Sequence, residues 1–204
     1  MNLRRYLHKR TLLIIAFVVI VLLSAVTFQT ISNDSPRVVS APQPTNATTQ
    51  NKTEKVRPGL PVRLKIPKIN VNAAIEYVGL TPQGEMGAPK DLSKVAWFNL
   101  GPRPGEKGDS VIDGHFGWVK NTVVVFNDLD KLQKGDKIYV QDDKGASVTF
   151  VVQSLRSYGK TQDTSGVFLS SDQKAHLNLI TCEGVWSETQ KTYSGRLVVF
   201  SDKD

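Results

Sequence analysis

Leu177-Asn178-Leu179-Ile180-Thr181-Cys182, near the C-terminus, is the stretch that organises the rest of the chain. It is short and mostly apolar, it lacks glycine and proline, and it ends in the only cysteine of the 204-residue sequence. A short apolar run of this kind predicts a buried β-strand. A lone cysteine is either a small buried apolar group or a reactive thiol. The stretch therefore predicts a strand that presents a thiol at its end.

Two other residues stand at the ends of apolar runs. His115 closes Val111-Ile112-Asp113-Gly114-His115, and Arg196 opens Gly195-Arg196-Leu197-Val198-Val199-Phe200. A catalytic cysteine needs a proton carrier, usually histidine, and a donor that stabilises the oxyanion. If the last two strands pair antiparallel, the end that holds Cys182 lies beside the start that holds Arg196. The three residue types together predict a nucleophilic site at the rim of a sheet.

The region from residue 59 onward reads as a series of short strands separated by turn signals, with almost no helix. Residues 123–132 fit a short helix or turn, and Asp142-Asp143-Lys144-Gly145 is a hairpin signal. Loops are expected from residue 157 to 172 and between the last two strands. This pattern predicts an all-β domain, a small barrel or sandwich of about eight strands. The strand-like runs are 62–66, 73–80, 95–98, 110–114, 137–141, 146–155, 177–182 and 195–200.

Charge is distributed unevenly along the chain. Residues 1–58 carry 8 Lys/Arg and 2 Asp/Glu, a net charge of +6, whereas residues 59–204 carry 18 and 17, a net charge of +1. The folded part is therefore almost neutral and lacks the basic surface that nucleic acids require. We expect no nucleic-acid partner.

The N-terminus has the pattern of a membrane anchor. Residues 1–10 are a basic tail, and residues 11–31 are an uncharged, largely apolar run long enough for a helix across a hydrocarbon core of about 30 Å. A cleavable signal peptide is the alternative, but the run is longer than its usual apolar region and no Ala-x-Ala site follows. Basic residues before the span predict that the tail is cytoplasmic. Residues 32–58 read as a flexible linker, so residues 59–204 are expected outside the cell.

No cofactor or metal is expected. The three histidines and one cysteine provide no closely spaced ligand pair, and the Asp128/Asp130 and Asp142/Asp143 pairs are interpreted as solvated turns rather than calcium ligands. His176 is the rival proton carrier for Cys182. It lies six residues earlier on the same expected strand, roughly 20 Å away along extended chain, which is too far for proton transfer.

The motifs resemble the sortases, membrane-anchored cysteine transpeptidases of bacterial surfaces. Leu179-Ile180-Thr181-Cys182 is similar to their Leu-x-Thr-Cys signature, Gly114-His115 to their histidine motif, and Arg196 begins the last strand as in the family. The resemblance covers about residues 61–201 and is class F-like. The segments that carry this wider likeness are 64–69, 97–98, 104–108, 125–132 and 135–136.

The resemblance implies an eight-stranded β-barrel, a substrate and a reaction. By resemblance, Cys182 attacks the threonine carbonyl of an LPXTG-like sorting signal at the C-terminus of an exported protein. His115 protonates the departing amine, and Arg196 holds the substrate and the oxyanion. The thioester is then resolved by an amine of a peptidoglycan precursor or of a pilin lysine.

The resemblance also points to substrate contacts and leaves one departure. The loop that precedes the cysteine strand is expected to hold the signal, with Val167, Phe168 and Thr181 as candidate contacts; Val167 and Phe168 fit packing on the domain's own core equally well. Asp113 stands where the family commonly has a small apolar residue. It either tunes His115 or faces away.

Two other functions fit parts of the sequence. Cysteine transpeptidases of peptidoglycan stem peptides have a Ser-His-Gly-Cys element with an arginine close behind, whereas here Leu-Ile-Thr precedes Cys182 and Arg196 follows fourteen positions later (196 − 182). The second alternative is an anchored, non-catalytic β-domain that binds wall polymer or a partner protein. A transpeptidase and a binding domain differ in their need for the thiol, because only the enzyme requires it.

Overall fold

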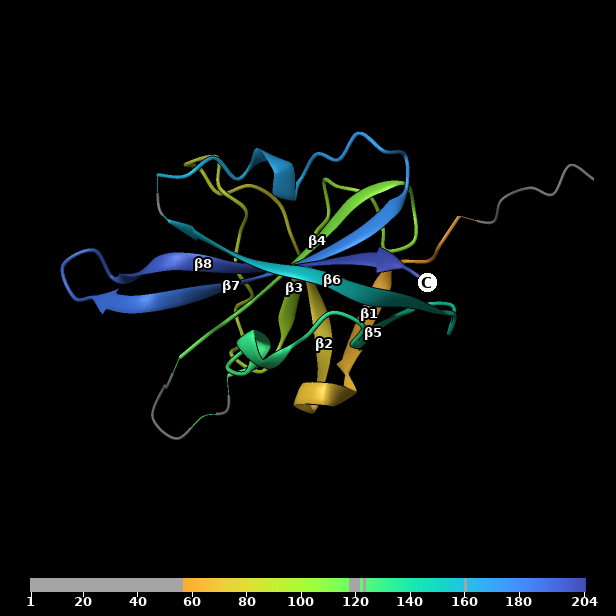
Figure 1. Ribbon diagram of the computed structural model, residues 1–204, viewed down its shortest axis with the longest axis horizontal. Helices are drawn as coiled ribbons and strands as arrows, with labels where there is room; N and C mark the ends of the chain where they lie inside the picture. Colours follow the sequence, from red (N-terminus) through yellow and green to blue (C-terminus); the bar gives the residue numbers. More distant parts are fainter. Residues whose placement is uncertain (1–56, 118–121, 123, 160) are drawn as a thin grey trace, which may run out of the picture. The chain divides into compact units, whose positions relative to one another are not determined.

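The computed structural model describes residues 57–117, 122, 124–159 and 161–204. In this part the chain forms an all-β closed barrel of eight strands (Figure 1). The predicted anchor over residues 11–31 and the tail before it lie outside the described residues, as does nearly all of the linker. Among the residues that the structure does describe, no helix has the length and apolar character needed to cross a membrane.

Short strands at the start of the domain give way to long strands at its end. The three 3-10 helices of the described region have only three residues each. The elements are β1 (Pro61–Ile66), η1 (Pro67–Ile69), β2 (Val71–Val78), β3 (Val95–Phe98), β4 (Gly108–Gly114), η2 (Leu129–Lys131), β5 (Lys137–Asp142), β6 (Ser147–Gly159), η3 (Ser165–Val167), β7 (Ala175–Ser187) and β8 (Thr192–Lys203).

The strand order around the barrel is β1-β2-β3-β4-β7-β8-β6-β5, and β5 closes the barrel by pairing with β1. The β2–β3 and β4–β7 pairs are parallel, and the other pairs are antiparallel. β7 therefore lies between β4 and β8. The strand that carries Cys182 thus has as neighbours the strand that leads into His115 and the strand that contains Arg196.

The barrel interior holds the apolar side chains that alternate along these strands. Leu177 and Leu179 of β7 and Ile112 of β4 are fully buried there, and Phe126 and Phe150 are the largest of the fully buried side chains. Because successive strand residues point to opposite faces, His176, Asn178, Ile180 and Cys182 share the outer face of β7. The core thus places the thiol on the outside of the barrel, where a substrate can reach it.

The long strands differ from the sequence prediction. The segment between Cys182 and Arg196 was expected to be a loop, but β7 continues to Ser187 and β8 begins at Thr192. The two ends pair through Trp186 and Tyr193, after an irregularity that follows Glu183, and project together from the barrel (Figure 1). Residues 183–194 lack clean apolar alternation, so their strand character comes from pairing with each other rather than from local pattern.

Candidate active site on the outer face of the sheet

Cys182 and Arg196 are direct cross-strand partners. The antiparallel register pairs Thr181 with Leu197 and Cys182 with Arg196. Leu197 belongs to the interior, so Arg196 faces outward like Cys182. Side chains opposite each other in an antiparallel pair have Cβ atoms about 5 Å apart. The predicted antiparallel neighbourhood of these two residues is confirmed.

The parallel pairing of β4 with β7 brings His115 to the same place. Asp113 pairs with Ile180 in the parallel ladder. His115 follows Asp113 by two residues, and Cys182 follows Ile180 by two residues. The hydroxyl of Thr181 donates to the Gly114 carbonyl oxygen at 2.7 Å, which extends the contact between the two chains beyond the last ladder pair. Cys182 and Arg196 thus lie in one cross-strand row, and His115, directly after the end of β4, lies beside that row; these three residues are called the candidate catalytic row below.

Gly114 allows the core to pack closely beneath His115. A Cβ at position 114 would lie 2.3 Å from Cδ2 of Phe126, so any side chain there would collide with a fully buried ring. The backbone N–H of Phe126 also donates to the His115 carbonyl oxygen at 3.0 Å. The Gly-His pair in the sequence therefore has a steric cause, because Phe126 fixes the backbone that carries the imidazole.

The imidazole of His115 is held by the loop between β2 and β3. Its Nε2 donates to the Pro89 carbonyl oxygen at 2.8 Å, because a carbonyl oxygen can only accept. No hydrogen bond between the imidazole and the Cys182 sulfur occurs within the described residues. Contacts of this kind often tighten only when substrate is present. The half-buried positions of both side chains keep them accessible to a bound peptide.

Arg196 makes only neutral contacts in this conformation. Its Nη1 donates to the Gly195 carbonyl oxygen at 2.9 Å, and its Nη2 lies 3.5 Å from the Thr192 hydroxyl. No ion pair involves Arg196 in the part of the chain that the structure describes. Its charge is therefore not neutralised by a carboxylate contact and can act on the thiol or on a substrate oxyanion.

Three influences act on the thiol of Cys182. Burial raises its pKa, the nearby positive charge of Arg196 lowers it, and the negative charge of Asp113 raises it further. The net effect is a raised pKa. At neutral pH the thiol form therefore predominates, and the reactive thiolate is the minor species.

The candidate substrate contacts lie in different environments. The side chain of Thr181 is 1% exposed and faces the interior, where its hydroxyl is occupied by Gly114. Val167 is also only 1% exposed, so a peptide would reach its side chain only if this segment moved. Phe168 is half-buried, with its ring edge-to-face against Phe98 at a centroid distance of 5.7 Å. Their role in substrate binding remains a prediction.

An aromatic cluster adjoins the candidate catalytic row and was missed in the sequence. Tyr193 packs edge-to-face on Phe116 at 5.3 Å and on Trp186 at 5.2 Å between ring centroids. Gly117 has a φ of +106°, and a Cβ there would lie 2.1 Å from the Tyr193 hydroxyl. The cluster ties the β7–β8 hairpin to the segment after His115. The sequence prediction missed this cluster because it placed Trp186 and Tyr193 in a loop between the last two strands.

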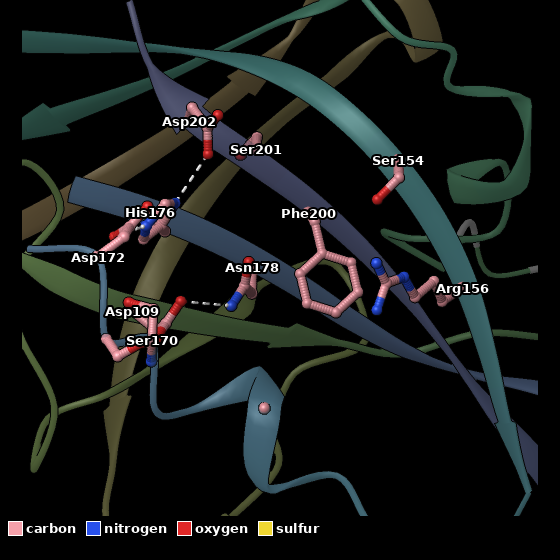
Figure 2. A pocket seen from close by; sticks show the side chains of 12 residues that line it. Asp109, Ser154, Arg156, Ser170, Asp172, His176, Asn178, Phe200, Ser201 and Asp202 are labelled. Carbon is pink, nitrogen blue, oxygen red and sulfur yellow. Dashed lines mark hydrogen bonds and ion pairs between the residues drawn. The ribbon is translucent and has the colours of Figure 1, made fainter. Parts of the chain in front are cut away.

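A polar cavity of about 380 Å³ opens farther along the same sheet face (Figure 2). Its centre is Asn178, which donates to the carboxylate of Asp109 at 3.1 Å and to the Val167 carbonyl oxygen at 2.7 Å. Asp109 also accepts from the backbone N–H of Ser170. These bonds fix η3 and the segment after it on the sheet.

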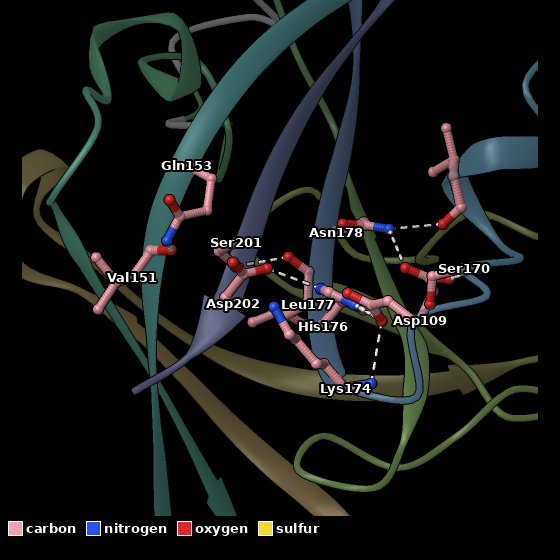
Figure 3. A network of polar contacts seen from close by, with 12 residues as sticks. Asp109, Val151, Gln153, Ser170, Lys174, His176, Leu177, Asn178, Ser201 and Asp202 are labelled. Atoms are coloured by element: carbon pink, nitrogen blue, oxygen red, sulfur yellow. Dashed lines mark hydrogen bonds and ion pairs between the residues drawn. The ribbon is translucent and has the colours of Figure 1, made fainter.

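His176 belongs to this polar network and not to the candidate catalytic row. Its Nδ1 lies 2.7 Å from Asp202 (Figure 3), and its Nε2 lies 2.8 Å from Asp172 (Figure 2). These partners raise its pKa, although burial acts in the opposite direction with the largest single effect. The interpretation that His176 does not serve Cys182 agrees with this placement. Among the residues that the structure describes, no group of three or more histidine, cysteine or carboxylate side chains is arranged to hold a metal.

Solved sortase structures resemble this fold. Sortase C-1 from Actinomyces oris is 25% identical, with a TM-score of 0.56 over 70% of this chain and 73% of that one. A lid mutant of sortase A from Corynebacterium diphtheriae is 21% identical, with a TM-score of 0.55 over 76% and 74% of the two chains. Sortase C from Clostridium perfringens is 23% identical, with a TM-score of 0.51 over 73% and 72%.

The comparison with protein families agrees with the fold. The curated proteins contain no match to this chain. The family model described as the sortase domain matches residues 64–204, which is more than half of the chain and includes Cys182, His115 and Arg196. The chain therefore belongs to the sortase family, whose members are cysteine transpeptidases.

Proposed function

We propose that Cys182, His115 and Arg196 form the active site of a sortase that cleaves an LPXTG-like sorting signal and transfers it to an amine. The observation that carries this proposal is the direct pairing of Cys182 with Arg196 on the outer face, with the end of β4 alongside. The family supplies the general activity, transpeptidation by a cysteine. The residues and the substrate class are the proposed part.

In the first half-reaction the Cys182 thiolate attacks the carbonyl carbon of the signal's threonine. The negative charge that develops on the carbonyl oxygen is stabilised by the guanidinium of Arg196. The C–N bond to the next residue breaks, and the departing amine takes a proton from His115. The products of this half-reaction are a thioester on Cys182 and a free amine.

In the second half-reaction an acceptor amine attacks the thioester carbonyl. His115 takes up the proton that the amine loses, the new amide bond forms, and the C–S bond breaks. Cys182 leaves as the thiolate and His115 is again protonated, so the site returns to its starting state. The proposed acceptors are a peptidoglycan precursor or a pilin lysine.

The proposal extends to location and class. Residues 11–31 would anchor the enzyme in a bacterial membrane as a single span, with residues 59–204 outside the cell, which is supported by the uncharged N-terminal run and the basic tail before it. The class F-like assignment rests on sequence segments alone. The structural relatives described above are sortases C and A.

A thioester-capture experiment tests the function. The full chain, in detergent, is incubated with a library of LPXTG-like peptides and an amine such as triglycine, and mass spectrometry detects peptide joined to the amine. We expect joined product from the wild type and none from Cys182→Ala. A non-catalytic binding domain would give no product from either protein and would bind its target equally well with and without the thiol.

A further inference from the structure

Asp113 is a carboxyl group that the proposed chemistry does not use, although it adjoins all three reactive side chains. It lies on β4 two residues before His115, and its ladder partner on β7 is Ile180, two residues before Cys182. Alternation places Asp113 on the same outer face as Cys182, because Ile112 points into the core. The carboxyl group is therefore one cross-strand row away from the catalytic row.

The surroundings of Asp113 on each neighbouring strand are mostly uncharged. Its partner on β3 is Ala96, and beyond Ala96 lies Glu76 of β2, which pairs with Lys94 at 3.3 Å. On the other side Ile180 and then Val198 occupy the same row. No ion pair involves Asp113 within the described residues. Its strongest electrostatic neighbours are therefore the groups of the catalytic row.

The carboxyl group of Asp113 carries its charge against the effect of burial. Burial raises the pKa of Asp113 to about 6, and attraction to His115 and Arg196 only partly opposes this rise. Asp113 is therefore mostly ionised at neutral pH, although its surroundings disfavour the charge. The same charge repels a thiolate at Cys182.

We propose that Asp113 is a positioning residue whose carboxylate opposes early ionisation of Cys182 and thereby sets the pH range in which the thiol reacts. The inference rests on the proposed role of Cys182. A neutral thiol is protected from oxidation and from unproductive attack until substrate arrives. Asp113 favours the neutral thiol through charge alone, without a direct bond to Cys182.

Asp113→Asn tests the proposal because it removes the charge and keeps the shape. In the full chain, the rate of Cys182 alkylation by iodoacetamide is measured from pH 5.5 to 10, in the absence of peptide. Loss of the neighbouring negative charge makes the thiolate easier to form, so the curve moves to lower pH. At pH 7 the variant is expected to react about threefold faster or more. Asp113→Glu keeps the negative charge, so its alkylation curve is expected to stay close to that of the wild type.

Asp130→Asn is the matched control. Asp130 is exposed on η2, and its substitution changes net charge equally without an electrostatic effect on Cys182. Its alkylation curve is expected to coincide with that of the wild type. A curve for Asp113→Asn that also coincides with the wild type would overturn the proposal.

Two further readouts separate charge tuning from a structural role. The kcat/KM profile for peptide transfer is expected to move to lower pH in Asp113→Asn, because the thiolate of Cys182 forms more readily. Since the carboxylate is ionised against its surroundings above pH 6, the amide is expected to raise Tm at pH 7.5 but not at pH 4. A fall in Tm at pH 7.5 with an unchanged alkylation curve would show a structural role and overturn the proposal. If no variant transfers peptide but the alkylation curve moves, the proposed function fails and the charge coupling stands.

Discussion

The outer face of β7 carries two polar regions with opposite character. At one end, the side-chain nitrogens of Asn178 and His176 all have hydrogen-bond partners, including carboxylates on β4, on β8 and in the preceding loop. At the other end, Cys182, Arg196 and Asp113 make no ion pair within the described residues. The first region fixes a loop to the sheet, because satisfied buried polar groups specify one arrangement. The second leaves its charges without an ion-pair partner, which supports the proposal that the chemistry takes place at that end.

The largest expected effect is the loss of peptide transfer when the Cys182 end of β7 is changed. Cys182→Ala removes the only nucleophile, so peptide transfer is expected to fall by roughly 10⁴-fold or more. The fold should remain, because the side chain is only half-buried and carries no structural bond. Mass spectrometry of the thioester and a thermal melt measure the two properties. Ser154→Ala, on the same face but at the polar cavity, is the control and should transfer peptide normally.

The two arginines of this face provide the next test. Arg196→Lys keeps the charge but loses the fork of donors, and kcat is expected to fall about 100-fold. Arg156 is the matched control: it lies on β6, opposite Val198, with its guanidinium over the Phe200 ring at 5.2 Å. Arg156→Lys should leave kcat nearly unchanged. An equal fall in kcat in the two variants would contradict the proposed difference between the two regions, since it would mean that both contribute to the chemistry.

Asn178→Ala tests the polar region by stability. Asn178 is 1% exposed, and its removal leaves the buried carboxylate of Asp109 and the Val167 carbonyl without a shared donor. The free energy of unfolding is expected to fall by about 2 kcal/mol. Urea denaturation measures this loss. The catalytic row should be affected only through KM, as η3 loosens, and a fall in kcat with KM unchanged would contradict the proposed division of roles.

The smallest expected effect is the pH dependence of His176. Both ring nitrogens face carboxylate oxygens, which only accept, so the observed geometry requires the doubly protonated ring. The raised pKa means that the stabilisation is present below the ordinary pKa of histidine and is lost as pH rises through the raised value. Comparison of Tm for the wild type and His176→Gln from pH 5.5 to 9 should show a difference of a few degrees at most, and only at the acidic end. His176 is 14% exposed but its partners are 45% and 42% exposed, so solvent weakens the pairs.

Most strand positions could be predicted because their apolar residues alternate. The runs at 62–66 and 95–98 correspond closely to β1 and β3, and the predicted strand 177–182 forms the core-facing part of β7. The outer parts of β7 and β8 could not be predicted in this way. Trp186 and Tyr193 pair across a hairpin that leaves the barrel, where no buried face imposes alternation.

The sequence by itself determined the residue types of the site and their position at the ends of apolar strands. It also indicated the family through the flanks of Cys182, His115 and Arg196, which the match over residues 64–204 confirmed. Those signals are local, because each depends on a few consecutive residues.

Only the tertiary structure decided that Cys182 and Arg196 are cross-strand partners beside the end of β4 and that Asp113 lies in the next row on the same face. The register of the parallel β4–β7 pair joins residues 67 positions apart, and it is set by hydrogen bonds between strands and by core packing at Gly114. A shift of one residue would turn every side chain of β7 to the opposite face. No local pattern specifies such a register, and for this reason the charge coupling of Asp113 became visible only in the folded protein.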